Sequence, residues 1–302
     1  MINPILSFSA TRRMRSFRTL LIMGAYLAVL LGIVAALMPA LFRNQILLGS
    51  LSSGITCYAV LIGAQFALLV LIAPALSSAA IAGERERQTL ELLLVTQTGS
   101  LRIVLGKAME SFAVLALLVV TGLPVTCLCL LTGAVTLSQV LAGEGFLLAV
   151  AFGGTAVGVF SSALCRRTVS ATVVSYLMIL VIAVLTALPF LTGYPRWITD
   201  VIYDEKRYWS MPAGEALAMI SPLLLANPGY GLLSLLCGQT RLGASSMDYR
   251  GWGRILCTWR VMDRAGGETV GLLSAGMIIL AGILLLLLAA LLVRPGDRKM
   301  KQ

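Results

Sequence analysis

The sequence predicts an all-α membrane protein with six transmembrane helices, and three observations carry this prediction. Only 12% of the 302 residues are charged and 59% are hydrophobic, whereas a soluble domain has about a quarter of its residues charged. Six apolar stretches reach the roughly 20 residues that cross about 30 Å of hydrocarbon. Lysine and arginine are concentrated at the two termini and in alternate connections between these stretches, which is the pattern of a membrane protein with a fixed orientation.

The six predicted spans are residues 19–41, 54–77, 108–132, 145–164, 169–191 and 269–293. Pro39 is expected to close the first span, and Pro74 lies near the end of the second. The first span follows a basic stretch and is too long for the apolar core of a signal peptide, so we expect it to remain in the protein. Lipid covers the surface of such spans, so residues 1–302 are predicted to form a single transmembrane domain.

The distribution of basic residues predicts that both termini are cytoplasmic. Fourteen basic residues lie at the termini and in two connections: Arg12, Arg13, Arg15, Arg18, Arg85, Arg87, Arg102, Lys107, Arg166, Arg167, Arg294, Arg298, Lys299 and Lys301. The alternate short loops contain only Arg43. Basic loops stay on the cytoplasmic side. The net charge of +10 therefore indicates membrane orientation, and we expect no nucleic-acid partner.

Residues 192–268 form the largest piece outside the six spans and are predicted to be extracytoplasmic. Within them, residues 216–237 are apolar but are interrupted by Ser221-Pro222 and by residues 227–230, Asn-Pro-Gly-Tyr. The two halves of about nine residues are each only about 14 Å long as helices. A partly inserted helical hairpin between the fifth and sixth spans is expected, because neither half crosses the bilayer.

A second helix is predicted in the same outer segment. Trp252, Ile255, Trp259 and Met262 recur at helical spacing with arginines between them. Tryptophan and arginine both favour the membrane–water boundary. We interpret this stretch as an interfacial helix, with an ordinary loop as the alternative.

Several enzyme classes lack the residues they need. The chain has no histidine, which removes the commonest general base and the commonest metal ligand. A phosphate-binding loop needs Gly, four residues and then Gly-Lys-Ser/Thr. The pair Gly106-Lys107 fails this pattern, because Leu101 stands at the first glycine position and Ala108 follows the lysine. We expect no catalytic, cofactor-binding or metal site on this chain.

The connection after the second span carries the most distinctive pattern. Residues 83–94 read Gly-Glu-Arg-Glu-Arg-Gln-Thr-Leu-Glu-Leu-Leu-Leu. Glu84 and Glu86 suit the first turn of a helix, where carboxylates stabilise the dipole. Leucines then form a short apolar stripe. Gly99 can end this helix, and Ser100 can cap the next one, which continues into the third span. Either this segment is a solvated loop that fixes topology, or it is a docking helix for a cytoplasmic partner.

These residues, followed by Gly99-Ser100 and Leu105-Gly106-Lys107, resemble the segment after the second span of ABC-2 type permeases. The six-span layout, the basic N-terminal segment and the hairpin extend the resemblance along the chain. One departure is that residues 96–99 read Thr-Gln-Thr-Gly, where the family often has a proline.

The resemblance implies a function and a set of partners. The chain would be the permease subunit of an exporter in the plasma membrane, the cytoplasmic membrane of a bacterium. It would work as a homodimer or with a sister permease. A separate cytoplasmic ABC ATPase would hold ATP and magnesium. Within the basic N-terminal interfacial segment 1–18, Ser7 to Arg18 would form an interfacial helix that contacts the ATPase, or an anchor for anionic lipid.

The resemblance also implies which residues couple the two subunits. Segment 83–100 would lie in a groove of the ATPase. The residues assigned to this coupling role are Glu84, Arg85, Glu86, Arg87, Thr89, Leu90, Glu91, Leu93 and Leu94. The charged residues would contact the ATPase, and the leucines would pack against it.

The alternative function is an ATP-independent secondary transporter or channel. Such proteins place ionisable groups near the middle of the membrane, and we find none there, because Glu110 lies at the cytoplasmic end of the third span and Glu144 precedes the fourth. Gln65 is the most polar residue within a span, and it is expected to form a helix–helix hydrogen bond. Gly154 and Gly158 are expected to allow close helix packing.

The cysteines divide into two groups. Cys57, Cys127, Cys129 and Cys165 lie inside or at the end of apolar runs and are interpreted as small core residues. Cys237 and Cys257 are the cysteines of the outer segment. They form a candidate disulfide if that side is oxidising, whereas Cys237 alone can also be a buried residue at the end of the hairpin.

Overall fold

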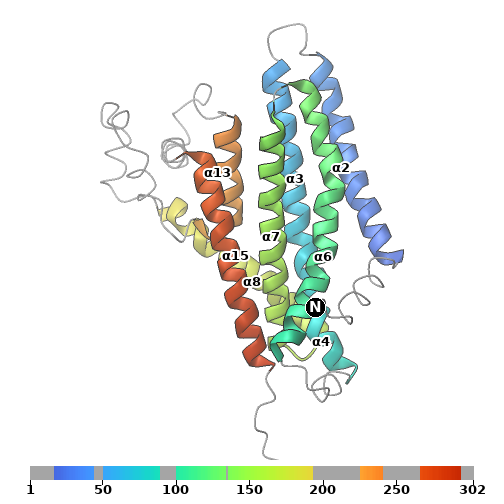
Figure 1. The fold of residues 1–302 in the computed structure, drawn as a ribbon, viewed down its shortest axis with the longest axis vertical. Helices are drawn as coiled ribbons and strands as arrows, with labels where there is room; N and C mark the ends of the chain where they lie inside the picture. The colour runs from blue at the N-terminus through green and yellow to red at the C-terminus, as the bar shows by residue number, and fades with distance from the viewer. Residues whose placement is uncertain are drawn as a thin grey trace, which may run out of the picture.

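The computed structural model describes residues 17–43, 50–88, 100–133, 135–192, 225–240 and 266–293. Over these residues the chain folds into an elongated helical bundle without strands (Figure 1). The helices are α2 (Phe17–Arg43), α3 (Ser50–Ser77), α4 (Ala79–Glu86), α6 (Ser100–Cys127), α7 (Leu137–Leu164), α8 (Thr168–Thr192), α13 (Pro228–Thr240) and α15 (Gly267–Leu292), with the short 3₁₀ helix η1 (Leu128–Thr132) after α6.

Within the described ranges, six helical segments are long and apolar enough to cross a membrane, as the sequence predicted. They are Thr19–Leu37, Gly54–Glu86, Ser100–Thr132, Leu137–Leu164, Thr168–Leu185 and Gly267–Leu292. The fold class and the multi-pass arrangement are therefore confirmed. The start of α2 and the end of α15 both point toward the end of the bundle where α4 lies (Figure 1), which we call the α4 end.

Helix α7 is the centre of the bundle, since it packs against α3, α6, α8, α13 and α15. In the most apolar 18-residue stretch of each helix, 67% of α7 is buried, but only 11% of α8. Leucines of α8 and α15 such as Leu180 and Leu284 are exposed. Such a surface suits lipid, because hydrocarbon solvates leucine as well as a protein core does.

Small residues let α7 approach its neighbours closely, as the sequence predicted for Gly154 and Gly158. A Cβ atom on Gly154 would lie 2.8 Å from Ala73 Cβ. A Cβ atom on Gly158 would overlap Ser77 Oγ and lie 2.8 Å from Ser77 Cβ. The two glycines therefore face α3 one turn apart, which confirms the packing role.

Helix α2 continues through Pro39 to Arg43, but its apolar membrane-crossing part is Thr19–Leu37 and ends just before this proline. The predicted start of the fourth span is wrong. Helix α7 begins at Leu137 rather than 145. The side-chain carbonyl of Gln139 accepts a hydrogen bond from the backbone nitrogen of Thr136 at 2.9 Å. This bond caps the N-terminus of α7 and stabilises a helix start at Leu137, before the predicted residue 145. As a consequence, Glu144 lies inside the fourth span and not before it.

Helix α13 begins at the break that the sequence indicated in the hairpin. Asn227 Oδ1 accepts hydrogen bonds from the backbone nitrogens of Gly229 and Tyr230 at 2.8 and 3.3 Å, and Pro228 is the first helical residue, a favoured arrangement at a helix start. The helix packs against α15 and α7. The first half of the predicted hairpin and the interfacial helix lie outside the described residues.

Hydrogen bonds hold α13 to the bundle at the end opposite α4. The side-chain amide of Gln139 on α7 donates to the backbone carbonyl of Gln239 at 2.8 Å, and the amide of Gln239 donates to the carbonyl of Gln139 at 3.1 Å. The hydroxyl of Tyr58 on α3 donates to the same carbonyl of Gln139 at 2.9 Å. These three hydrogen bonds therefore join α3, α7 and α13.

Candidate functional site

The charged residues of the predicted coupling segment lie at the end of α4. Helix α4 follows α3 after Ser78 and ends at Glu86. Arg87 is the residue that caps the helix, and Gln88 takes a φ of 57°, which a right-handed helix does not permit. Glu84 and Glu86 therefore stand in the last turn of a helix. The expectation that they belong to a first turn is wrong, because the apolar residues 79–82 before them are already helical.

The beginning of α4 is tied to α7. The hydroxyl oxygen of Ser162 accepts hydrogen bonds from the backbone nitrogens of Ile81 and Ala82 at 2.9 and 2.8 Å. These nitrogens lie in the first turn of α4, where no earlier helical carbonyl is available. Ser162 is fully buried. It therefore acts as a cap supplied by another helix.

Arg85 and Glu86 hold the turn between α7 and α8. Arg85 Nη1 donates to the carbonyl oxygens of Ala163 and Cys165, at 3.3 and 3.0 Å. The Glu86 carboxylate accepts hydrogen bonds from the backbone nitrogen and the hydroxyl of Thr168, both at 3.0 Å. The positively charged Arg85 thus binds the C-terminal carbonyls of α7, and the negatively charged Glu86 binds the N-terminus of α8. The helix dipoles favour both arrangements.

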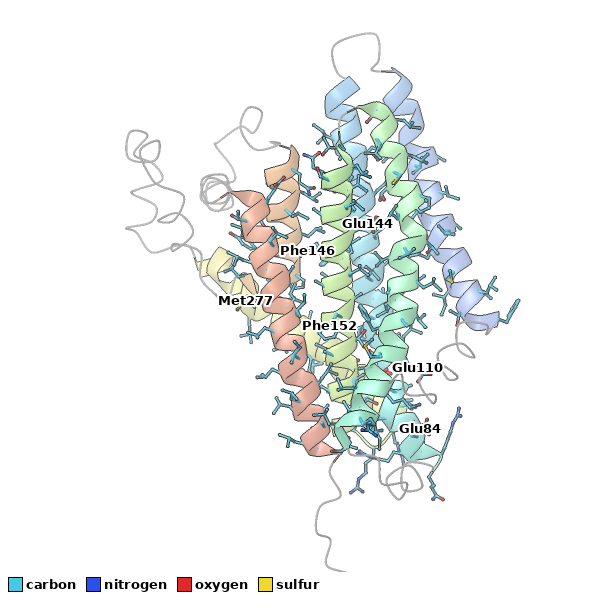
Figure 2. All side chains as sticks on the ribbon, viewed as in Figure 1. Glu84, Glu110, Glu144, Phe146, Phe152 and Met277 are labelled. Carbon is cyan, nitrogen blue, oxygen red and sulfur yellow. The ribbon has the colours of Figure 1, made fainter. Side chains whose placement is uncertain are left out.

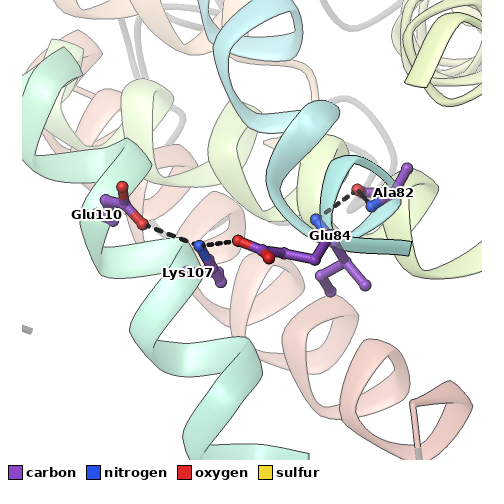
Figure 3. A network of polar contacts seen from close by, with 6 residues as sticks. Ala82, Glu84, Lys107 and Glu110 are labelled. Atoms are coloured by element: carbon purple, nitrogen blue, oxygen red, sulfur yellow. Dashed lines mark hydrogen bonds and ion pairs between the residues drawn. The ribbon is translucent and has the colours of Figure 1, made fainter. Parts of the chain in front are cut away.

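Glu84 links α4 to α6. Lys107 Nζ lies 2.8 Å from Glu84 Oε1 and 3.5 Å from Glu110 Oε2 (Figure 3). The side chains of Lys107 and Glu84 are each 26% exposed, so water screens this pair less than an open surface pair. The end of α4 thus contacts α6 through Glu84, α7 through Arg85 and α8 through Glu86.

The remaining coupling residues are placed differently. Arg87 is exposed at the tip of α4. Thr89, Leu90, Glu91, Leu93 and Leu94 lie outside the described residues, so their role stays a prediction. Helix α6 begins at Ser100 and runs without interruption through Arg102 and Lys107 into the third span, as the sequence predicted for the helix after Gly99.

The partners of the α4 end could be found only in part from the sequence. Thr168 follows two arginines that end an apolar run, which is a usual pattern at a helix start. Ser162 gave no such signal, because a serine among small residues on a span suggests packing alone. The carbonyls of Ala163 and Cys165 carry no sequence signal, since every residue has one.

The cysteines give a mixed result. Cys57 and Cys129 are buried, 4% and 3% exposed, as expected of core residues, and their sulfur atoms lie 4.0 Å apart. Cys237 lies on α13, whereas Cys257 is outside the described residues, so the disulfide between them stays a prediction. In the described residues no three His, Cys, Asp or Glu side chains form a group that could hold a metal.

A second polar group lies deep inside the bundle. Glu144 is 3% exposed and Gln65 is fully buried, and Figure 2 shows Glu144 between the long helices, far from Glu84. Glu144 is therefore an ionisable group inside the fourth span, Leu137–Leu164, and the expectation that it precedes this span is wrong. Gln65 on α3 lies beside the Glu144 carboxyl on α7, the neighbouring helix, although neither of its amide atoms has full hydrogen-bond geometry.

Comparison with known protein families gives a match over part of the chain. Residues 60–198 match the family model described as ABC-2 family transporter protein. The matched range includes α4, α6 and α7 together with all the described contacts of Glu84, Arg85 and Glu86. No curated protein matches the chain.

Proposed function

We propose that this membrane permease, which carries the sequence of the ABC-2 transporter family over residues 60–198, exports a substrate with energy from a separate ATPase subunit. The chain supplies the transmembrane path. The ATPase binds ATP and magnesium at the cytoplasmic face and contacts the α4 end. A second permease, an identical copy or a sister subunit, completes the path in the plasma membrane.

The observation that carries this proposal is that the last turn of α4 contacts three spanning helices at once. Glu84 pairs with Lys107 of α6, Arg85 bonds to the carbonyls that end α7, and Glu86 bonds to the first residue of α8. A force applied beyond Glu86 therefore reaches α6, α7 and α8 without passing through a loop.

The contacts divide the predicted coupling residues into two tasks. Glu84, Arg85 and Glu86 transmit motion, because their charged groups are engaged within the chain. Arg87 and Glu86 are both exposed at the tip of α4, but the carboxylate of Glu86 is bonded to Thr168. Arg87 therefore contacts the ATPase, together with residues 89–94 that follow it. Charge reversal at Glu84 or Glu86 would disturb the permease itself, so Arg87 is the better residue for a test of docking.

The docking role can be tested by co-purification of the chain with a candidate ABC ATPase from the same genome. Wild-type permease in mild detergent should retain the ATPase, and Arg87→Glu should lose most of it, by about tenfold or more if a charged contact of about 1.4 kcal/mol is reversed. Arg166→Glu, an exposed arginine in the turn between α7 and α8, is the matched control and should retain it.

Two outcomes would contradict the proposal. Equal retention by wild type and Arg87→Glu would remove Arg87 from the contact. Equal loss in Arg87→Glu and Arg166→Glu would show a general charge effect at this face rather than docking at the tip of α4.

A further inference from the structure

The buried group around Glu144 is drawn from four of the six spans. Glu144 lies on α7, Gln65 on α3, Tyr26 on α2 and Thr126 on α6. Their exposed fractions are 3%, 0%, 2% and 0%. We refer to these four residues as the Glu144 cluster.

The cluster has several polar atoms without partners. Thr126 Oγ1 donates to Glu144 Oε1 at 2.8 Å, but Glu144 Oε2 has no hydrogen-bond partner. The hydroxyl of Tyr26 has none either. The amide of Gln65 lies beside the Glu144 carboxyl, but neither of its two polar atoms has full hydrogen-bond geometry. An unpaired polar group in an apolar interior costs free energy. The unpaired polar atoms of the Glu144 cluster therefore indicate a place where a ligand binds.

The side chains of Gln65 and Tyr26 both point toward Gly122 on α6. A Cβ atom on Gly122, one turn before Thr126 on α6, would lie 2.5 Å from Gln65 Nε2 and 2.9 Å from the Tyr26 hydroxyl. Gln65 and Tyr26 therefore meet at Gly122, and the amide of Gln65 also approaches the Glu144 carboxyl. Only glycine at this position leaves them room.

The charge of Glu144 has no compensation within the described residues. The ion pairs there join Lys107 to Glu84 and Glu110, and neither reaches Glu144. The titratable groups that face its carboxyl are the hydroxyls of Tyr26 on α2 and Tyr58 on α3, and both are neutral at physiological pH. An isolated carboxylate inside a protein either binds a cation or takes up a proton.

The chemistry of the cluster indicates which cation fits. Its donors are oxygens: the Glu144 carboxylate, the Thr126 and Tyr26 hydroxyls, and the carbonyl of Gln65 after rotation of its amide, whose two ends are interchangeable in shape. Oxygen ligands suit hard cations, and one carboxylate balances one positive charge. The side chains of the cluster are almost fully buried.

We propose that the Glu144 cluster is a binding site for a single monovalent cation, either Na⁺ or a proton, inside the transmembrane bundle. The site is independent of the contact with the ATPase at the α4 end. Because its four ligands belong to α2, α3, α6 and α7, occupation of the site favours the arrangement in which these helices are packed as described here. Loss of the cation would favour another arrangement of the same spans.

The proposal can be tested by thermal unfolding of the purified full-length chain in detergent. The unfolding temperature is measured in NaCl and in choline chloride of equal ionic strength, each at pH 6 and pH 9. If Na⁺ binds, wild type at pH 9 should unfold at a higher temperature in NaCl than in choline chloride, since a ligand of the folded state alone stabilises it. If a proton binds, the unfolding temperature should fall from pH 6 to pH 9 in both salts.

Two variants provide the controls. Glu144→Gln keeps the shape and the acceptor for Thr126 but carries no charge, so its unfolding temperature should lose the Na⁺ dependence or the pH dependence seen in wild type. Glu110→Gln removes the carboxylate beside Lys107 and should keep the wild-type response. The proposal is overturned if wild type responds neither to Na⁺ nor to pH, or if Glu144→Gln responds as wild type does.

Direct binding of ²²Na⁺ to the same purified chain gives a second readout that does not depend on stability. If Na⁺ is the cation, wild type and Glu110→Gln should retain the label, and Glu144→Gln should lose it. Retention by Glu144→Gln would contradict the assignment. These measurements need no ATPase, so their failure would leave the proposed export function untouched, and failure of the docking test would leave the cation site untouched.

Discussion

At the scale of single residues, the end of α4 shows how charged side chains can serve helix ends rather than a partner. Glu86 occupies the position of an N-terminal cap for α8, although it is 82 residues away from Thr168 in the sequence. Arg85 serves the C-terminus of α7 in the same way. Both contacts satisfy backbone groups that a helix leaves without partners.

Removal of the Glu86 cap is expected to destabilise the protein modestly. Glu86→Ala should lower the free energy of unfolding by about 0.5–1 kcal/mol, since an exposed cap and its dipole interaction contribute amounts of this size. Thermal or denaturant unfolding of the purified chain measures this. Arg87→Ala is the neighbouring control and should change stability by less than about 0.5 kcal/mol. An equal loss in both variants would argue against the cap.

The Ser162 contact allows a second prediction at this scale. Ser162→Ala removes the acceptor for two backbone nitrogens of α4 and leaves them buried without a partner. We expect a loss of about 1–3 kcal/mol in the free energy of unfolding. Ser161→Ala is a matched control, because its hydroxyl bonds only to the carbonyl of Gly158 within its own helix. A similar loss in both would show that Ser162 has no special role.

At the scale of helices, the crossing of α3 and α7 depends on the absence of side chains. Ala73 and Ser77 of α3 face Gly154 and Gly158 of α7, so the two backbones approach closely. Without a hydrophobic driving force between helices in lipid, such van der Waals contact is a principal source of their association. Helix α4 follows directly after Ser77 and Ser78, so this crossing also sets where α4 begins.

A methyl group at Gly158 is expected to separate the two helices. Its Cβ would overlap Ser77 Oγ, so Gly158→Ala should cost about 1–3 kcal/mol in the free energy of unfolding. Gly145→Ala on the same helix has open space around the added atom and should be neutral or stabilise by up to about 1 kcal/mol. Both are measured by unfolding in detergent.

A second substitution checks that the cause is the contact with Ser77. Ser77→Ala removes the overlapping oxygen but leaves its Cβ, 2.8 Å from the added atom. The double variant Gly158→Ala with Ser77→Ala should therefore recover part of the lost stability. A purely additive effect of the two substitutions would contradict this explanation.

At the scale of the whole molecule, the proposed function requires the α4 end to face the cytoplasm. In a cysteine-free background, Arg87→Cys should react with a membrane-impermeant maleimide only in inverted vesicles. Ser138→Cys, exposed at the start of α7, should react in intact cells, because a 28-residue helix separates it from the turn that Arg85 contacts. The reverse labelling pattern would place the α4 end outside and exclude a contact with a cytoplasmic ATPase.

The sequence by itself determined the six spans and their order. A span is defined by a local property, about 20 consecutive apolar residues, so it is read without knowledge of its neighbours. The start of α7 was also available locally, since Thr136 and Gln139 have the spacing of a capping box, but the polar residues up to Glu144 lowered the hydropathy and moved the predicted boundary.

Only the tertiary structure decided which polar side chains of different helices contact one another. Glu86 with Thr168, Arg85 with Cys165, and Glu144 with Thr126 and Gln65 come from different helices, and hydrophobic periodicity does not specify which helix lies beside which. The crossing of helices is set by small residues such as Gly122 and Gly158, whose partners appear only once the bundle is assembled. For this reason the spans followed from composition, whereas the α4 contacts and the Glu144 cluster followed from packing.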